Sequence, residues 1–129
     1  SKSIANKIDS VNYTFVAQTA LPMRGSSVNL TSDYTLRVTK DTIEAYLPYF
    51  GRAYSAPLNP TDGGIKFSST DFSYTISDKK KGTWVVSIET NDTSSKIKLT
   101  LSIGESGYTS LYVMDNNRQP ISFYGSIKD

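Results

Sequence analysis

The feature that most constrains this chain is an alternation of apolar and polar residues with a period of two. Its clearest run spans residues 96–103, where Ile97, Leu99, Leu101 and Ile103 alternate with Lys96, Lys98, Thr100 and Ser102. Successive side chains of a β-strand point to opposite faces, so a run of this kind predicts a strand with one face against a core.

Similar alternation recurs along the rest of the chain. It marks residues 12–18, 34–39, 42–47, 65–67, 72–76, 84–89, 96–103, 111–113 and 121–127. Most of these runs are separated by short polar turns, such as 40–41, 77–82, 104–107 and 115–117. Short turns make sequential strands antiparallel neighbours. The pattern therefore predicts an all-β fold, an antiparallel meander of about nine strands in a single domain over residues 1–129. A lipocalin-like barrel and a two-sheet sandwich both satisfy it.

Two segments depart from this alternation before residue 34. Ile4 and Ile8 are four residues apart, which predicts a short helical lead-in over residues 1–10. Residues 23–32 are polar, and we expect a loop there, with an edge strand at Val28 and Leu30 as the alternative.

The composition excludes several classes of site. The chain has no cysteine and no histidine, which rules out disulfides, thiolate zinc sites and nucleophiles that depend on Cys or His. A formal net charge of +2 gives no argument for nucleic acid. No run approaches the 18 apolar residues of a membrane-spanning helix. We expect no cofactor, no metal site and no nucleic-acid partner.

Paired carboxylates are the remaining option for general acid–base chemistry. The candidates are Asp41 with Glu44, Asp62 with Asp71, and Glu89 with Asp92. Each is predicted at a turn or on the outward face of a strand, where solvent keeps both groups charged. We therefore predict no catalytic residue and expect that the protein is not an enzyme.

The long segment at residues 48–64 stands out among short turns. It is rich in aromatic residues and contains one arginine, and long ordered loops of compact domains are often functional. If it binds a ligand, the rings supply stacking area and the guanidinium supplies charged hydrogen bonds. The candidate ligand-binding residues are Tyr46, Tyr49, Phe50, Arg52 and Tyr54. In the alternative interpretation, these aromatic side chains close one end of the barrel.

The stretch Tyr46–Tyr54 (YLPYFGRAY), with Gly63–Phe67 after it, resembles the hallmark of an uncharacterised bacterial family. Asn12–Phe15 and Asn117–Gly125 resemble the same family, so the likeness spans nearly the whole chain. The family is a domain of unknown function in exported β-proteins, often lipoproteins, of Gram-negative gut-type bacteria. The resemblance implies a periplasmic or outer-membrane location and an export signal upstream of residue 1. It carries over no catalytic residue.

These observations favour a non-catalytic binding module for a small or extended ligand, such as a small molecule or a glycan. The alternative is a structural or assembly protein of the cell envelope, which acts through contacts of its helix and a sheet edge with another protein. An enzyme ranks last. Contact with a membrane is expected only through a lipid anchor upstream of this sequence.

Overall fold

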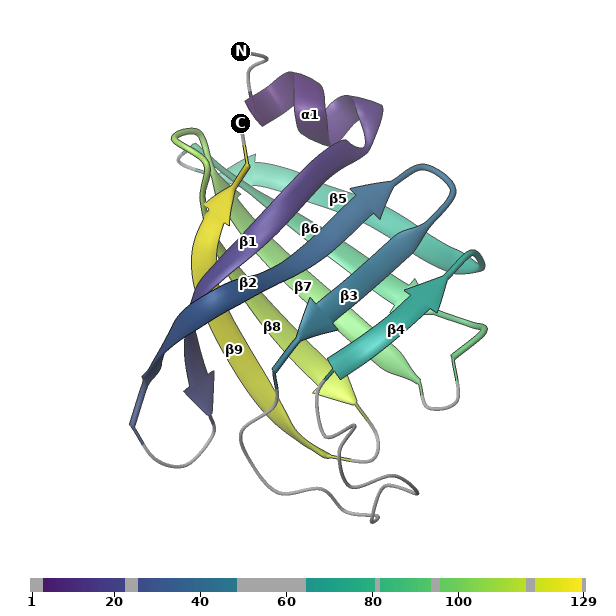
Figure 1. Cartoon of the computed structure of the whole chain (residues 1–129). Coiled ribbons are helices and arrows are strands. Elements are labelled where there is room, and N and C mark those ends of the chain that lie inside the picture. The colour runs from purple at the N-terminus through teal and green to yellow at the C-terminus, as the bar shows by residue number, and fades with distance from the viewer. Residues whose placement is uncertain are drawn as a thin grey trace.

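The computed structural model describes residues 4–22, 26–48, 65–80, 82–93, 96–115 and 118–128. One short helix and nine strands make up this part of the chain (Figure 1). Their bounds are α1 Ile4–Ser10, β1 Asn12–Pro22, β2 Val28–Thr39, β3 Ile43–Leu47, β4 Ile65–Ser69, β5 Phe72–Lys80, β6 Thr83–Thr90, β7 Ile97–Gly104, β8 Tyr108–Asp115 and β9 Arg118–Ile127.

All nine strands belong to one antiparallel sheet with the order β4-β3-β2-β1-β9-β8-β7-β6-β5. The first and last strands pair, so the sheet curls round on itself and forms a nearly closed barrel (Figure 1). Within the described residues, β4 and β5 are the two edges of the sheet, and we call the space between these edges the seam. The predicted meander is confirmed, and its form is barrel-like.

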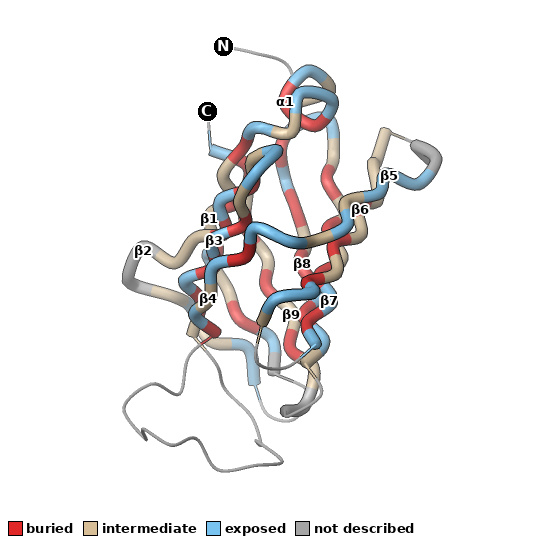
Figure 2. Tube along the Cα trace, turned by 90° about the vertical axis from the view of Figure 1, so that its right-hand side faces the viewer, coloured by how far each residue is buried: buried red, intermediate tan, exposed pale blue. Residues whose placement is uncertain are grey.

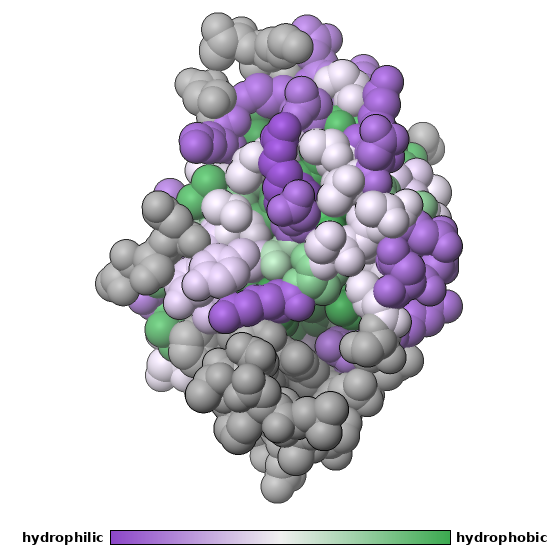
Figure 3. Space-filling view, turned by 45° about the vertical axis from the view of Figure 1, so that its right-hand side comes forward, coloured by the Kyte–Doolittle hydropathy of each residue, from purple (hydrophilic) through white to green (hydrophobic). Residues whose placement is uncertain are grey.

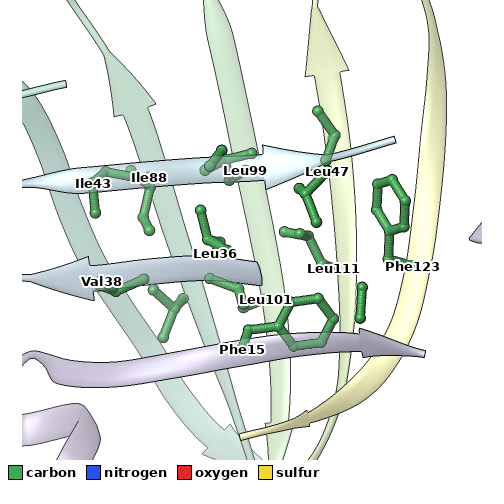
Figure 4. Close-up of a cluster of buried hydrophobic side chains, with 14 of the residues drawn as sticks. Phe15, Leu36, Val38, Ile43, Leu47, Ile88, Leu99, Leu101, Leu111 and Phe123 are labelled. Carbon is green, nitrogen blue, oxygen red and sulfur yellow. The ribbon is translucent and has the colours of Figure 1, made fainter. Parts of the chain in front are cut away.

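The inward face of the sheet carries the core, as the alternation predicts. Figure 2 shows buried positions that alternate along the strands with intermediate or exposed ones. The side chains of Phe15, Leu101 and Phe123 are fully buried and reach the same core cluster from different strands (Figure 4). Apolar burial of this kind contributes roughly 25 cal/mol per Å² and stabilises the barrel.

A sharp bend lets the two terminal strands meet. Ala17 of β1 pairs with Gly125 of β9, and Thr19 pairs with Tyr124, so β1 has one extra residue between these pairs. Such a bulge bends a strand and increases its twist. Gly125 fits here because a β-carbon at this position would overlap the carbonyl oxygen of Val16. A bulge and a glycine at one place are the usual way for a sheet to turn a barrel corner.

Helix α1 lies at the end of the barrel where both chain ends emerge (Figure 1). Ile8 packs into the core, and Lys7 Nζ donates a hydrogen bond of 2.9 Å to the carbonyl oxygen of Lys128. The helix is confirmed over residues 4–10 of the predicted lead-in. Near this end the hydroxyls of Tyr13 on β1 and Tyr74 on β5 are 2.9 Å apart, so a hydrogen bond crosses the interior.

The structure decides one alternative and corrects one boundary. Residues 28–32 begin β2, because Val28 and Asn29 pair with Ala20 and Thr19 of β1. The strand expected as the alternative is therefore present and the loop is not, although β2 as a whole lies between β1 and β3 and not at an edge. The turn expected at 77–82 is shorter, because β5 continues until Lys80 pairs with Thr83. In both places backbone pairing with a neighbouring strand outweighs a polar local sequence.

Candidate ligand-binding groove

A groove of about 380 Å³ lies over β6, β7, β8 and β9 near the turn that joins β7 to β8. Seven of its eight lining residues carry a hydroxyl group, and the eighth is a glycine. They are Thr83, Ser102, Gly104, Ser106, Tyr108, Thr109, Ser110 and Tyr124. The groove therefore presents hydroxyl groups and two aromatic rings, with no side chain that is charged at neutral pH.

The register of the sheet explains why this surface is hollow. Ser102 lies opposite Ser110, and Ser110 lies opposite Tyr124, so the three form one row across β7, β8 and β9. Their strand neighbours Leu101, Leu111 and Phe123 are buried in the core, so this row points outward. The small side chains keep the floor low, while Tyr124 rises at one side.

Gly104 lowers the floor further. It pairs with Thr83 of β6 and has no side chain to fill the space beside Tyr108, whose own side chain is 63% exposed. A β-carbon at Gly104 would lie 3.3 Å from the carbonyl oxygen of Tyr108. The groove thus combines a floor of glycine and serine with tyrosine walls.

The turn at one end of the groove is held by backbone hydrogen bonds. The Gly107 N–H donates to the Gly104 carbonyl at 2.9 Å, and Gly107 takes a φ of 95° that L-residues rarely adopt. The Gly107 carbonyl in turn accepts from the Ile127 N–H and from the Thr109 hydroxyl, both at 2.9 Å. These bonds tie the turn to β9 and hold the backbone on both sides of Tyr108.

Several hydroxyls of the groove are open to a ligand. Within the described residues, the side chains of Ser102, Ser110 and Tyr124 make no hydrogen bond to the protein. A hydroxyl both donates and accepts, so this lining can satisfy either kind of group. Glu105 stands between Gly104 and Ser106 in the chain but is not part of the lining, and its carboxylate lies beside Gly82. The arrangement suits a neutral ligand with many hydrogen-bonding groups.

Of the residues predicted from the long loop, only Tyr46 falls in the described part of the chain. Its side chain is 49% exposed on β3, and its ring stacks on Tyr34 of β2 at 5.6 Å between centroids. Lys66 of β4 lies opposite it, with Nζ 5.1 Å from the ring centroid. Tyr46 thus takes part in a cross-strand cluster. Tyr49, Phe50, Arg52 and Tyr54 lie outside the described residues, and their role as a site stays a prediction.

The structure gives Asp92 a partner set that the sequence did not indicate. Its carboxylate accepts hydrogen bonds from the Ser69 hydroxyl and from the backbone N–H groups of Thr70 and Asp71, the last two at 3.0 and 3.2 Å. The Ser69 hydroxyl and then the Thr70 N–H lower the pKa of Asp92 below its ordinary value. Asp92 therefore clamps the turn between β4 and β5.

The carboxylate pairs considered for catalysis are arranged differently. Glu89 lies opposite Lys98 in the ladder of β6 and β7, while Asp92 bonds to the turn at 69–71. Asp41 and Glu44 are both exposed, and Asp62 lies outside the described residues. In the described ranges no three His, Cys, Asp or Glu residues come together in a way that could hold a metal ion.

Nothing in the sequence singled out the groove. Ser102 and Tyr124 were expected on outward faces, but Ser and Thr are ordinary on the solvent side of a strand. The available signal was the contrast in size between Tyr108, Tyr124 and the small residues beside them. That contrast becomes a groove only when the register places those residues together.

Comparisons with known proteins agree with the fold. A family model described as "Domain of unknown function (DUF4251)" matches residues 1–127. Among solved structures, the chain is similar to the crystal structure of a DUF4251 family protein from Bacteroides eggerthii DSM 20697. That likeness has a TM-score of 0.70 at 15% identity and covers 95% of this chain and 83% of the other, which shows a common fold. No curated protein matches. In the described part, no helix is long and apolar enough to cross a bilayer.

Proposed function

This chain belongs to the DUF4251 family, whose description names no activity, and we propose from its geometry that it is a non-catalytic binding module. The ligand binds in the groove over β6–β9. The observation that carries this proposal is a hollow in which the hydroxyls of Ser102, Ser110 and Tyr124 make no hydrogen bond to any described residue of the protein. Binding sites are typically concave, with a few polar groups that fix the orientation of the ligand.

The chemistry of the lining supports binding rather than catalysis. General acid–base catalysis needs a group that titrates near the working pH and lies within hydrogen-bond reach of the reacting atom. The lining contains no carboxylate and no amine, and the chain has no imidazole or thiol. The hydroxyls and rings of the groove can hold and orient a ligand.

A blocking substitution tests the proposal. Ser102→Phe fills the floor of the groove from an outward position and leaves the core unchanged. The probe is a library of neutral small molecules that carry hydroxyl and amide groups, followed by amide chemical shifts. We expect probes to shift the amides of Ser102 and Ser110 in the wild type, and we expect Ser102→Phe to weaken that binding at least about tenfold, or roughly 1.4 kcal/mol.

The matched control is Ser73→Phe, which places the same ring on an exposed outward position of β5. It should leave probe binding within about twofold, since Ser73 pairs with Glu89, six residues along β6 from the lining residue Thr83. The proposal is wrong if no probe shifts the groove amides, or if both variants weaken binding equally.

A second candidate function has its own observation. β4 and β5 end the sheet, and apolar side chains are visible between polar ones on the side of the molecule that contains the seam (Figure 3). Ile76 of β5 is 43% exposed, although its register partner Val86 is a fully buried core residue. An open edge beside exposed apolar surface can accept a strand from another protein. This arrangement supports an assembly role in the cell envelope.

The two candidate functions predict different effects of a substitution at the seam. Ile76→Lys adds a charge at the seam and should abolish recovery of a partner from cross-linked envelope fractions if the second candidate is correct. The same variant should leave probe binding in the groove unchanged. Fractionation of cells that express the full-length protein tests the periplasmic or outer-membrane location that we propose for either role.

A further inference from the structure

We infer that the ligand of the groove is a neutral oligosaccharide that continues along β8 and β9 over a second row of hydroxyl-bearing side chains. This inference rests on the proposed function and goes further by naming the ligand class and its path. The second row consists of Thr100, Tyr112 and Ser122, which lie opposite one another on β7, β8 and β9.

The second row continues the surface of the first. Along each strand it lies two residues from the row of Ser102, Ser110 and Tyr124, so both rows point to the same face. Two residues of a strand span about 7 Å. The hydroxyl-bearing surface is therefore longer than the groove alone, and it extends along the direction of the strands.

The chemistry of this surface matches that of sugars. Each sugar hydroxyl needs a donor and an acceptor when it leaves water, and Ser, Thr and Tyr hydroxyls supply both. Neither row contains a side chain that is charged at neutral pH. The first cation along β7 is Lys98, which pairs with Met114 in the next row outward. A polyanion would require cations within the two rows, so a neutral chain fits better.

The tyrosines suit a chain of several sugar units. Tyr108 and Tyr112 are four residues apart on β8, about 13–14 Å, and are 63% and 39% exposed. Tyr124 comes from β9 opposite Ser110, between them along the strand. Tyrosine rings offer apolar faces to the C–H faces of sugars and keep a polar tip in water. One sugar ring cannot reach both ends of this surface, whereas a short oligosaccharide can.

A peptide in extended form fits this surface poorly. Strand addition needs an open edge with free N–H and C=O groups. β7, β8 and β9 each have a paired neighbour on both sides, so their backbone groups are already used in the sheet. A ligand on this surface is therefore bound by side chains, and these side chains carry hydroxyl groups and aromatic rings.

Calorimetric titration with defined sugars tests the inference. The probes are cellohexaose, maltohexaose and mannohexaose, their disaccharides, and hexagalacturonate as the charged counterpart. We expect at least one neutral hexasaccharide to bind at least about tenfold more tightly than its disaccharide, or roughly 1.4 kcal/mol. Tyr112→Ala should weaken binding of that hexasaccharide about tenfold and leave disaccharide binding within about twofold.

Two further variants complete the design. Ser122→Phe blocks the second row without removing a ring and should reproduce the effect of Tyr112→Ala. Ile76→Ala removes an exposed apolar side chain from β5 and should leave both affinities unchanged. Thermal unfolding shows that each variant is folded before it is titrated.

Each unfavourable result has a distinct meaning. If neutral small molecules shift the groove amides but no neutral hexasaccharide binds, the inference is wrong and the proposed function stands. Tighter binding of hexagalacturonate than of any neutral sugar overturns the neutral ligand class. If Tyr112→Ala weakens disaccharide and hexasaccharide binding equally, the claim that the sugar chain extends over the second row is wrong. If neither small molecules nor sugars reach the groove, both the inference and the proposed function fail.

Discussion

At the scale of single residues, Gly125 is a position where the fold leaves no room for a side chain. A β-carbon there would overlap the Val16 carbonyl oxygen and lie 2.9 Å from the carbonyl carbon, and both atoms belong to backbone that cannot swing away. We predict that Gly125→Ala lowers the free energy of unfolding by more than about 3 kcal/mol, measured by urea denaturation. Ser126→Ala, one residue on, should change it by less than about 1 kcal/mol. If Gly125→Ala lowers the free energy of unfolding only slightly, β1 and β9 do not pack as closely at this position as the overlap with Val16 implies.

The hydroxyl pair of Tyr13 and Tyr74 forms a second residue-scale feature. Tyr13 is 2% exposed, so Tyr74→Phe leaves a buried hydroxyl without its partner. We predict a loss of about 1–3 kcal/mol in unfolding free energy for Tyr74→Phe. The double variant Tyr13→Phe with Tyr74→Phe should cost less than the sum of the single variants, because no orphaned hydroxyl remains. Additive losses in this cycle would show that the hydroxyls do not interact.

Burial of Tyr13 also predicts a pH dependence. Removal from water, reinforced by Tyr74, raises the pKa of Tyr13 well above its ordinary value of 10.0. A raised folded-state pKa gives stability that is fully present below pH 10 and is lost as the pH rises further, by about 1.4 kcal/mol per pH unit. Urea denaturation at about pH 9 and pH 11 should show this fall. Tyr13→Phe should flatten it, and an unchanged slope in that variant would contradict the assignment.

Asp92 predicts the opposite dependence in acid. Its folded-state pKa lies below 3.8, so its contribution is present above pH 3.8 and is lost as the pH falls through the folded-state value. Asp92→Asn should lower the melting temperature at neutral pH and reduce its further decrease between about pH 4 and pH 2. Asp41→Asn, in the exposed turn before β3, should keep the wild-type decrease. If the melting temperatures of the two variants fall equally between about pH 4 and pH 2, Asp92 does not stabilise the turn.

At the scale of elements, the seam between β4 and β5 separates two kinds of strand. β8 is bonded on both sides, while β5 is bonded only to β6 within the described sheet. Amides at a free edge open more readily than those in the centre of a sheet. We predict that amides of residues 75–77 exchange hydrogen at least about ten times faster than those of residues 110–113. Equal protection would mean that the edge of β5 is covered.

Elements were the level at which the sequence was most informative. The alternation at 97–103 predicts both the strand and its buried face, because one face of a barrel must be apolar throughout. For Val28 and Leu30 the local sequence leaves a loop and a strand both open, because the pairing of this segment with β1 is a contact between separate parts of the chain. The groove was missed for the same reason. Ser102, Ser110 and Tyr124 are ordinary surface residues until three strands bring them into one row.

At the scale of the whole molecule, one pairing determines the shape. The predicted meander left open how the sheet ends, since a row of hairpins can stay open, stack as two layers or curl. The pairing of β1 with β9 curls it and moves the free edges to β4 and β5, in the middle of the chain. Sequence patterning contains little information about this choice, because it depends on a bulge after Ala17 and on Gly125.

The same pairing of β1 with β9 has a consequence for synthesis on the ribosome. The N-terminal strands emerge first, and β1 receives its second partner only after residues 118–127 have been made. Until then the backbone N–H and C=O groups on one edge of β1 have no strand partner, and the apolar face of the N-terminal strands is uncovered. That edge is open to wrong partners, including other nascent copies of the same chain. We therefore expect that shielding β1 during translation raises the yield of folded protein, even though the finished barrel places that strand in the middle of its sheet.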